Sequence, residues 1–392
     1  GVEIMRVSSL SACVALATTL YACGSTPPKT ATTDAKPRAS ETPVAAAAEP
    51  ATAPLPVVEV IPRPVGVYAA SSLSGDYAGY AAVTTAIERL EQEEGFDRAY
   101  LYGLFSRLER QQWILDYLNR PKRPSTGKPT GSWTRYRKKF VTEQHIERGL
   151  RFWREHAATL QRAQHRYGIP PEYVVAIIGV ETHYGANVGR HRVVNALATL
   201  AFDYPRRSDF FTRELEHYLV MARNEGFDPF APRGSYAGAM GLGQFMPSSF
   251  HRFAVDFDGD GRRDLWHAAD AIGSVANYFS AHGWRAGEPV VIPAVARGGD
   301  PRLMKAGYDT RYRVDTLAQQ GLVARFPLDA EGEVSLLRLD AIGGYEYWLG
   351  LPNFYVITRY NHSSYYAMAV YQLAQALRER RERLDGVRIS LR

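Results

Sequence analysis

The stretch GIPPEYVVAIIGVETHYG, residues 168–185, predicts a helix that lies inside the protein. It begins with Pro170 and Pro171, and a proline in the first turn of a helix forfeits no hydrogen bond. Apolar side chains then recur at helical spacing, at Tyr173, Val174, Ile177 and Ile178. Gly185 is the expected end of the helix, because glycine readily takes the left-handed conformation that ends many helices.

Glu181 falls on the apolar face of this helix, four residues after Ile177 and seven after Val174. Burial disfavours the charged form of a carboxyl group and so raises its pKa. The negative end of the helix dipole acts in the same direction in the last turn. Two interpretations stay open from these residues alone: a carboxylic acid that holds a proton for catalysis, or a buried glutamate paired with an arginine.

A second notable stretch is GSYAGAMGLGQFMPSSF, residues 234–250, with four glycines among small and apolar residues. Glycines allow close approach of the backbone to a ligand, and they allow unusual turn angles. Gln244 adds a paired donor and acceptor beside them, and Pro247 is expected to begin a helix. The alternative is a tight loop between helices without a ligand.

The stretch DFDGDGRRDLWHAAD, residues 256–270, predicts a cation-binding loop of the EF-hand type. The pattern places carboxylates at positions 1, 3 and 5, the sharp turn at position 6 and a backbone carbonyl at position 7; these are Asp256, Asp258, Asp260, Gly261 and Arg262. Position 12 is His267, which cannot act as a bidentate oxygen ligand. An acidic turn without a metal is the alternative.

The composition allows a substantial core, because 45% of the 392 residues are hydrophobic and 12% are aromatic. The formal net charge of +6 is compatible with nucleic acid, an anionic membrane surface or an acidic polymer as partner. No basic run is interleaved with aromatic residues, so no nucleic-acid partner is expected.

The N-terminus predicts a lipoprotein. The apolar run at residues 7–20 has fourteen residues, fewer than the roughly 20 that a membrane span needs. The following LYACGS resembles a bacterial lipobox, so residues 1–22 are expected to be a signal peptide and Cys23 the lipidated first residue. No aspartate follows Cys23, which favours the periplasmic face of the outer membrane. An ordinary secretory signal with a chance cysteine is the alternative.

The rest of the chain predicts an α+β protein that is mainly helical. Residues 23–65 are rich in Ala, Pro and Thr and are expected to be a disordered tether. Helical patterns cover 84–96, 100–120, 142–168, 193–226 and 363–384, and short β-like runs cover 288–295, 333–341 and 345–351. The expected divisions are a helical lobe at 66–165 completed by 355–392, a core at 166–287 and a small antiparallel β lobe at 288–354.

Five stretches in the same order resemble the membrane-bound lytic murein transglycosylase B family, which includes the soluble 35-kDa type. They are IIGVETHYG, NALATLAFDYPRRSDFF, GSYAGAMGLGQFMPSSF, AIGSVANYFSAHGW and LPNFYVITRYNHSSYYAMAV, and the likeness runs from about residue 96 to the last helix. The resemblance implies a lysozyme-like core that cleaves the MurNAc–GlcNAc β-1,4 bond of peptidoglycan without water. It also implies glycan strands and stem peptides as partners, with other cell-wall enzymes as further candidates.

In this resemblance Glu181 matches the single catalytic acid and base. It would protonate the leaving glycosidic oxygen and then take the proton of the C6 hydroxyl of the same MurNAc, which gives a 1,6-anhydro end. No second catalytic carboxylate is evident near Glu181 in the sequence, whereas ordinary glycoside hydrolysis uses two. No cofactor is implied for catalysis.

The resemblance also assigns the saccharide groove and the metal. The matching groove residues are Tyr136, Arg206, Arg207, Ser235, Gln244, Tyr278, Tyr360, Asn361 and Tyr366. Structural Ca²⁺ would be bound in the EF-hand-like loop, closed by Asp270. His183, where the family often has arginine, is a departure. The alternatives are a non-catalytic peptidoglycan-binding lipoprotein, and a hydrolytic lysozyme on the same fold.

Overall fold

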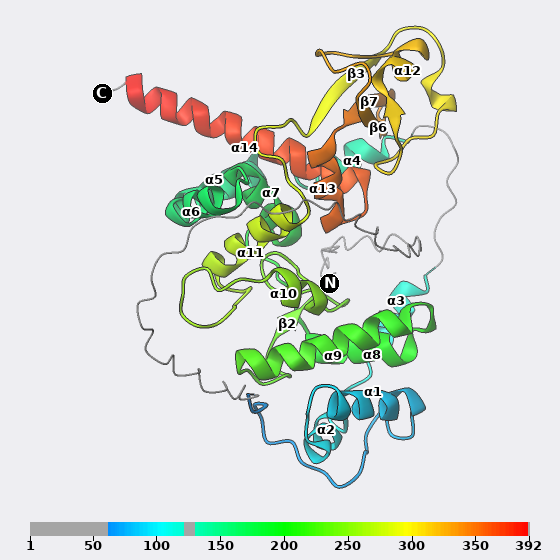
Figure 1. Cartoon of the computed structure of the whole chain (residues 1–392), viewed down its shortest axis with the longest axis vertical. Helices are drawn as coiled ribbons and strands as arrows, with labels where there is room; N and C mark the ends of the chain where they lie inside the picture. Colours follow the sequence, from blue (N-terminus) through cyan, green and yellow to red (C-terminus); the bar gives the residue numbers. More distant parts are fainter. Residues whose placement is uncertain (1–61, 121–129, 391–392) are drawn as a thin grey trace, which may run out of the picture.

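The computed structural model describes residues 62–120 and 130–390 (Figure 1). The predicted signal peptide at 1–22, Cys23 and residues 23–61 of the predicted tether lie outside the described residues. No helix in the described ranges is long and apolar enough to cross a membrane.

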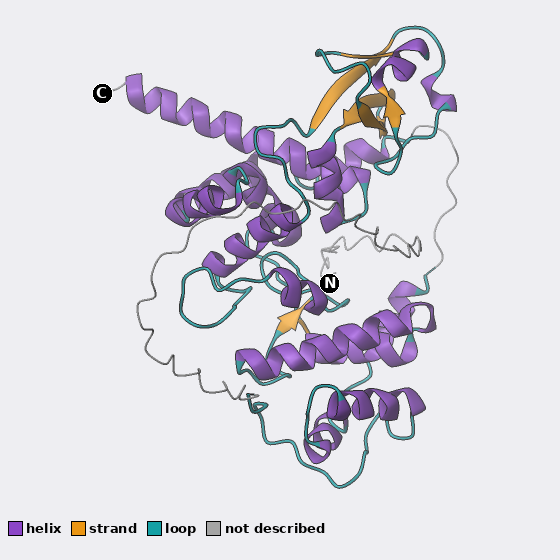
Figure 2. Ribbon diagram, viewed as in Figure 1, coloured by secondary structure: helices purple, strands orange, loops and turns teal. Residues whose placement is uncertain are grey.

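The described chain is mainly helical with a small antiparallel sheet near its C-terminal end, as predicted, and a two-stranded ribbon in addition (Figure 2). The α-helices of the first part are α1 (Ala81–Gln92), α2 (Arg98–Phe105), α3 (Gln112–Leu118), α4 (Ser132–Arg137), α5 (Glu143–Glu155), α6 (Ala157–Tyr167), α7 (Pro171–Thr182), α8 (Val193–Asp203) and α9 (Ser208–Glu225). Those that follow are α10 (Pro247–Phe253), α11 (Ala268–Ala281), α12 (Val314–Gln319), α13 (Pro352–Tyr360) and α14 (Ser364–Ser390). Short 3₁₀ turns are η1 (Pro205–Arg207) and η2 (Pro301–Leu303).

Helix α7 is the centre of the molecule. Residues 172–180 are all buried, so the helix is covered on every side rather than on one face. Helices α5, α6, α11 and α14 pack around it (Figure 1). The two prolines begin the helix as predicted, with Pro171 at its first position.

The strands form two sheets. A two-stranded ribbon pairs β1 (His191–Arg192) with β2 (Arg233–Gly234). The larger sheet has the order β4-β6-β7-β3-β5 and is antiparallel throughout; its strands are β3 (Val291–Ala296), β4 (Tyr312–Arg313), β5 (Leu322–Ala324), β6 (Glu333–Ala341) and β7 (Gly344–Gly350). It lies at one end of the molecule and has its own small apolar cluster.

The helices between residues 66 and 165 fall into two groups. Helix α1 packs on α9 and α3 packs on α8, whereas α5 and α6 pack on α7 (Figure 1). This range therefore contributes to both ends of the helical part. The division of the chain into segments stays a prediction.

Three of the predicted helical runs are interrupted. The run at 193–226 breaks between α8 and α9, at Tyr204, whose φ of −120° and ψ of 81° lie outside the helical range. The run at 100–120 breaks between α2 and α3, because the amides of Glu109 and Gln111 donate to the side chains of Asn195 and Thr199 on α8. The run at 142–168 breaks at His156, whose φ of −113° and ψ of 23° lie outside the helical range.

Candidate active site

Glu181 lies in the last turn of α7 and is half-buried. The helix ends at Thr182 and not at Gly185, so that prediction was wrong by three residues. His183 and Tyr184 both have left-handed backbones, with φ of 52° and 60°. The amide of His183 donates to the carbonyl of Gly179, which closes the helix without a glycine at this position.

The carboxyl of Glu181 has an elevated pKa. Burial raises it from 4.5 to about 7, and a hydrogen bond from Tyr366 acts in the opposite direction. The Tyr366 hydroxyl donates to Glu181 Oε1 at 2.5 Å. No charged group among the described residues contributes to the shift, so the arginine partner that the sequence left open is not present there. This carboxyl can hold a proton near neutral pH, as a general acid must.

Two tyrosines interact with Glu181, and a third packs on one of them; the three come from three helices. Tyr366 is fully buried at the start of α14. The Tyr360 hydroxyl, at the end of α13, donates to the carbonyl of Gly243 at 2.5 Å. Burial, assisted by the charge of Glu181, raises the pKa of Tyr360. Tyr278 on α11 packs on Tyr360 with ring centres 4.8 Å apart and donates to a backbone carbonyl at 2.6 Å.

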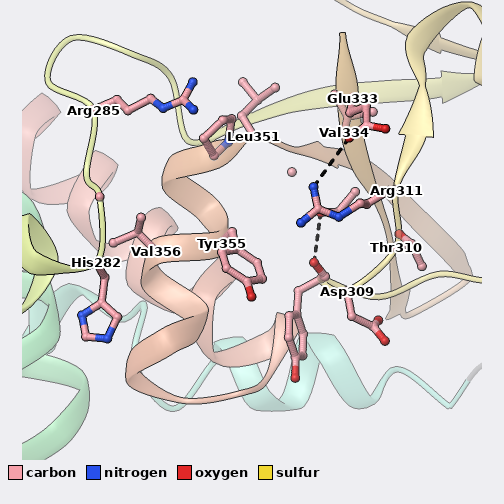
Figure 3. Close-up of a pocket in the computed structure, with 15 residues that line it drawn as sticks. His282, Arg285, Asp309, Thr310, Arg311, Glu333, Val334, Leu351, Tyr355 and Val356 are labelled. Atoms are coloured by element: carbon pink, nitrogen blue, oxygen red, sulfur yellow. Dashed lines mark hydrogen bonds and ion pairs between the residues drawn. The ribbon is translucent and has the colours of Figure 1, made fainter. Parts of the chain in front are cut away.

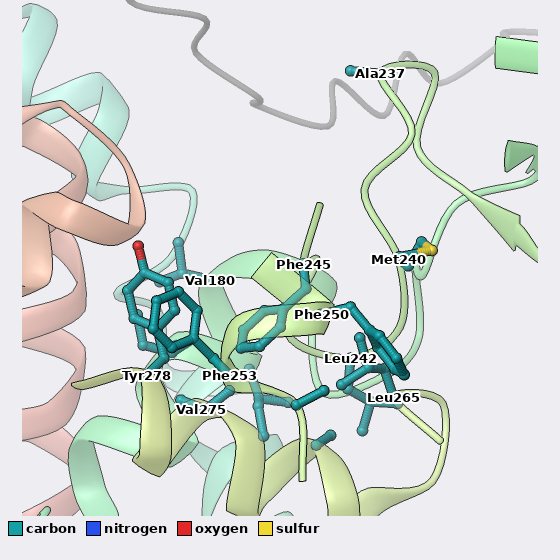
Figure 4. Packing of buried hydrophobic residues seen from close by; sticks show 14 of the residues in the cluster. Val180, Ala237, Met240, Leu242, Phe245, Phe250, Phe253, Leu265, Val275 and Tyr278 are labelled. Carbon is teal, nitrogen blue, oxygen red and sulfur yellow. The ribbon is translucent and has the colours of Figure 1, made fainter. Parts of the chain in front are cut away.

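The glycine-rich stretch forms a tight loop over an apolar base (Figure 4). Ser235 is buried, and its Oγ accepts from the amides of Ala237 and Ala239 at 3.2 and 3.0 Å. Gln244 has a left-handed backbone, and its side chain donates to the carbonyls of Val188 and Gly241. Both predicted groove residues therefore hold the loop in shape. Their contact with a substrate stays a prediction.

The remaining predicted groove residues lie at different distances from Glu181. Tyr136 on α4 is close enough to influence the pKa of Tyr366. Asn361 ends α13, and its side-chain oxygen is buried without a hydrogen bond from the described residues. Arg206 is exposed, and the Arg207 guanidinium stacks on Phe210 at 4.1 Å. Neither arginine forms a hydrogen bond or ion pair with Glu181 in the described chain.

The sequence singled out His183 but not its partner in a histidine pair, His145. His145 on α5 is buried, and its Nδ1 lies 3.3 Å from Nδ1 of His183. Burial, assisted by His183, lowers the pKa of His145 to about 4, so His145 is neutral at physiological pH. The only signal in the sequence is the position of His145 on the buried face of α5, next to Ile146.

The Tyr184 ring fills a slot between α5 and α7. A Cβ atom added to Gly149 or to Gly179 would lie 2.5 or 2.6 Å from Tyr184 atoms. Both glycines are therefore needed for the ring to reach this place.

The predicted cation loop brings its carboxylates together. One oxygen from each of Asp256, Asp258 and Asp260 lies within 4.8 Å of the others. Asp256 also accepts from the amides of Gly259 and Gly261 at 2.7 and 2.8 Å, which folds the loop around it. Arg262 has an exposed side chain, and its amide donates to Asp260.

Asp270 closes the loop from the first turn of α11. It is 1% exposed and accepts from the amides of Phe257 and Asp264, each at 2.7 Å. Asp258, His267 and Asp270 form a second group of atoms within 4.8 Å, and His267 Nδ1 is 2.9 Å from Asp258. Asp258 thus belongs to both groups and links Asp270 to the other predicted carboxylates of the loop.

A separate pocket of about 480 Å³ lies between the sheet and the start of α13 (Figure 3). Arg285, Arg311, Glu333 and Tyr355 contribute polar groups to it, and Arg311 is 3.6 Å from Glu333. None of the predicted site residues lines this pocket.

Comparisons with known proteins identify the family. The family model described as a transglycosylase SLT domain matches residues 79–375. The membrane-bound lytic murein transglycosylase B of Escherichia coli K12 is 48% identical over 310 residues, 78% of this chain and 85% of that protein. The structure of the Escherichia coli lytic transglycosylase SLT35 in complex with calcium has a TM-score of 0.74 at 47% identity, and covers 79% of this chain and 96% of that chain. SltB3 of Pseudomonas aeruginosa, solved in complex with NAG-NAM-pentapeptide, has a TM-score of 0.67 at 30% identity, over 77% of this chain and 80% of that chain. The chain belongs to the membrane-bound lytic murein transglycosylase B family.

Proposed function

We propose that this enzyme cleaves the MurNAc–GlcNAc β-1,4 bond of peptidoglycan without water and leaves a 1,6-anhydroMurNAc end. The observation that carries the proposal is the single carboxyl of Glu181, whose pKa is raised to about 7 with no charged partner among the described residues. Mass spectrometry of products released from purified peptidoglycan tests it. Products one water lighter than hydrolytic ones are expected, whereas reducing MurNAc ends would indicate a hydrolytic lysozyme.

In this mechanism Glu181 acts twice. As an acid it gives its proton to the leaving glycosidic oxygen, while the N-acetyl group of the substrate stabilises the oxocarbenium-like state. As a carboxylate it then takes the proton from the C6 hydroxyl, whose oxygen forms the new bond to C1. The Tyr366 hydroxyl, 2.5 Å from Oε1, stabilises the carboxylate form between the two steps.

The pH dependence of kcat/KM should report the ionisation of Glu181. The free enzyme is competent when Glu181 is protonated, so kcat/KM is expected to fall as the pH rises through about 7. Tyr366→Phe removes the hydrogen bond that lowers the pKa of Glu181, so its alkaline limb should move to higher pH. A limb that stays in place in the Tyr366 variant would contradict this assignment.

We infer that the EF-hand-like loop binds structural Ca²⁺ through Asp256, Asp258, Asp260, Asp270 and the carbonyl of Arg262. Clustered carboxylate oxygens suit this cation, and a bound ion would offset the repulsion among them. The loop joins α10 to α11 and lies outside the group of tyrosines at Glu181, so the ion would stabilise the fold and take no part in bond cleavage.

Removal of calcium should therefore lower stability before it affects chemistry. Chelation is expected to reduce the melting temperature by several degrees, since a ligand at about 100 times its Kd stabilises by about 2.7 kcal/mol. Differential scanning calorimetry with and without added Ca²⁺ measures the shift. An unchanged melting temperature, together with no calcium retained on dialysis, would contradict the site.

We also propose that Cys23 carries the lipid that anchors the enzyme to the periplasmic face of the outer membrane. The N-terminal lipobox pattern supports this placement. A Cys23→Ala protein should appear in the soluble periplasmic fraction.

The alternative to an enzyme is a non-catalytic binding protein, which would bind peptidoglycan and release no products.

A further inference from the structure

The ribbon of β1 and β2 places positive charges side by side. Arg192 on β1 is directly opposite Arg233 on β2. Like charges opposite each other on neighbouring strands destabilise the pair. Within the described part of the chain, neither arginine forms an ion pair with a carboxylate, and Arg233 instead donates to the carbonyl of Arg190 at 2.8 Å. The repulsion between the two guanidinium groups is therefore not offset by a carboxylate of the described chain, and a negatively charged ligand would offset it.

These cations line a cavity of about 350 Å³. Its walls are Glu109, Gln111, Arg190, His191, Arg192, Asn195 and Arg233. Glu109 is the single acidic group of that lining, and it already accepts from the Asn195 side chain at 3.1 Å. Arg190, Arg192 and Arg233 are all exposed. The cavity therefore suits a group with negative charge.

A group of aromatic rings is linked to this cavity through His191, which belongs to its lining. Trp113 on α3 is 40% exposed, and its ring centre lies 4.5 Å from that of His191. Tyr117, one turn further along α3, is 39% exposed and lies 5.2 Å from Tyr236. Tyr236 also meets Trp113, at 6.4 Å. Partly exposed rings of this kind can stack on the apolar faces of sugars, with their polar atoms left at the rim.

The cavity is continuous in sequence with the candidate active site. Gly234 on β2 is followed directly by Ser235 and the glycine-rich loop, and β1 follows the end of the catalytic helix by eight residues, from His183 to Arg190. The two loops are also in contact, since Thr182 donates to the carbonyl of Leu242 and Gln244 donates to the carbonyl of Val188. The cavity is therefore built on the same pair of loops that follow Glu181 and surround Gln244.

We propose that Trp113, Tyr117 and the arginines at 190, 192 and 233 form a further subsite for the glycan strand, which binds an aminosugar unit that carries a carboxylate. The inference rests on the proposed function, because it takes peptidoglycan as the substrate. The rings bind the sugar face, and the arginines bind carboxylates of the stem peptide or, where the peptide has been removed, of the lactyl group.

Binding to long glycan strands tests the subsite in a Glu181→Gln background, where no turnover occurs. Trp113→Ala and Arg192→Ala are each expected to raise the Kd for long strands about tenfold. Trp113→Phe and Arg192→Lys should recover most of the affinity. A tetrasaccharide that occupies only the region at Glu181 should bind all these proteins equally. Phe326→Ala and Arg297→Ala, exposed residues of the β lobe, are the matched controls.

Three ligands separate the sources of the charge. Strands with stem peptides and strands stripped to lactyl carboxylates test the two carboxylates, and a neutral chitooligosaccharide should respond to Trp113→Ala but not to Arg192→Ala. The subsite would be overturned if the Trp113 and Arg192 variants bound long strands as tightly as the controls do. It would also be overturned if these variants lost affinity for the tetrasaccharide as much as for long strands. The proposed function itself would fail in a different way: the wild-type enzyme would release no 1,6-anhydro product.

Discussion

Glu181→Gln should abolish the release of 1,6-anhydro products from peptidoglycan. Glutamine keeps the shape of the side chain but can neither give a proton to the glycosidic oxygen nor take one from the C6 hydroxyl. Because one group serves both steps, the loss should be at least the 10²–10⁴-fold that general acid–base catalysis contributes. The measurement is quantitative mass spectrometry of soluble products, with wild type and variant at equal concentration.

Glu172→Gln is the matched control for this loss. Glu172 is a buried glutamate in the first turn of the same helix, and burial raises its pKa too. The Glu172→Gln variant should keep a turnover rate within a few-fold of that of the wild type. A Glu172 variant as inactive as the Glu181 variant would mean that damage to α7, rather than loss of the acid, explains the effect.

The stability of the Glu181 variant provides a second check. The folded-state pKa of about 7 lies above the ordinary 4.5, so the contribution of Glu181 to stability is present at low pH and is lost as the pH rises through about 7. Glutamine has no such loss. The variant should therefore unfold at a higher temperature than wild type in mildly alkaline buffer, although it is inactive.

Asp270→Ala should cause the largest loss of stability among single changes in the cation loop. The carboxylate is 1% exposed and accepts from the amides of Phe257 and Asp264, so its removal leaves two donors without their partner. Each such loss costs about 1–3 kcal/mol, which together predicts a drop in melting temperature of the order of 10 °C. The drop should persist in the presence of chelator.

Asp260→Ala is the companion variant. Asp260 is exposed and accepts from a single neighbouring amide, that of Arg262, at 2.8 Å. It should weaken calcium binding with little change in the melting temperature of the metal-free protein. Equal losses of metal-free stability in both variants would show that the loop is held by its carboxylates as a group and not by Asp270.

The sequence predicted those features that depend on neighbours along the chain. The helix before Glu181 and the strand at residues 333–341 follow from local pattern, and both are confirmed. The breaks at 106–111 and at His156 were not predicted, since the first depends on Asn195 and Thr199 of a distant helix. The same limit applies to Tyr366, which is 185 residues from the glutamate to which it donates.

Within the candidate site, residue type alone did not reveal which polar groups the fold already uses. Ser235 and Gln244 carry hydrogen bonds that shape their own loop. The ribbon of β1 and β2 has two residues in each strand, which is too short for an alternating pattern to be recognised. Its paired arginines became visible only when the register was known.

The slot that holds Tyr184 has a consequence for how such a protein can change over generations. Gly149 lies on α5, Gly179 lies on α7, and Tyr184 lies in the turn after α7. The Tyr184 ring fits only because neither glycine has a side chain. A larger residue at either glycine would therefore require a smaller side chain at position 184. In a set of descendants these three positions should therefore vary as a unit, while the exposed Ala186 at the tip of the turn can vary independently.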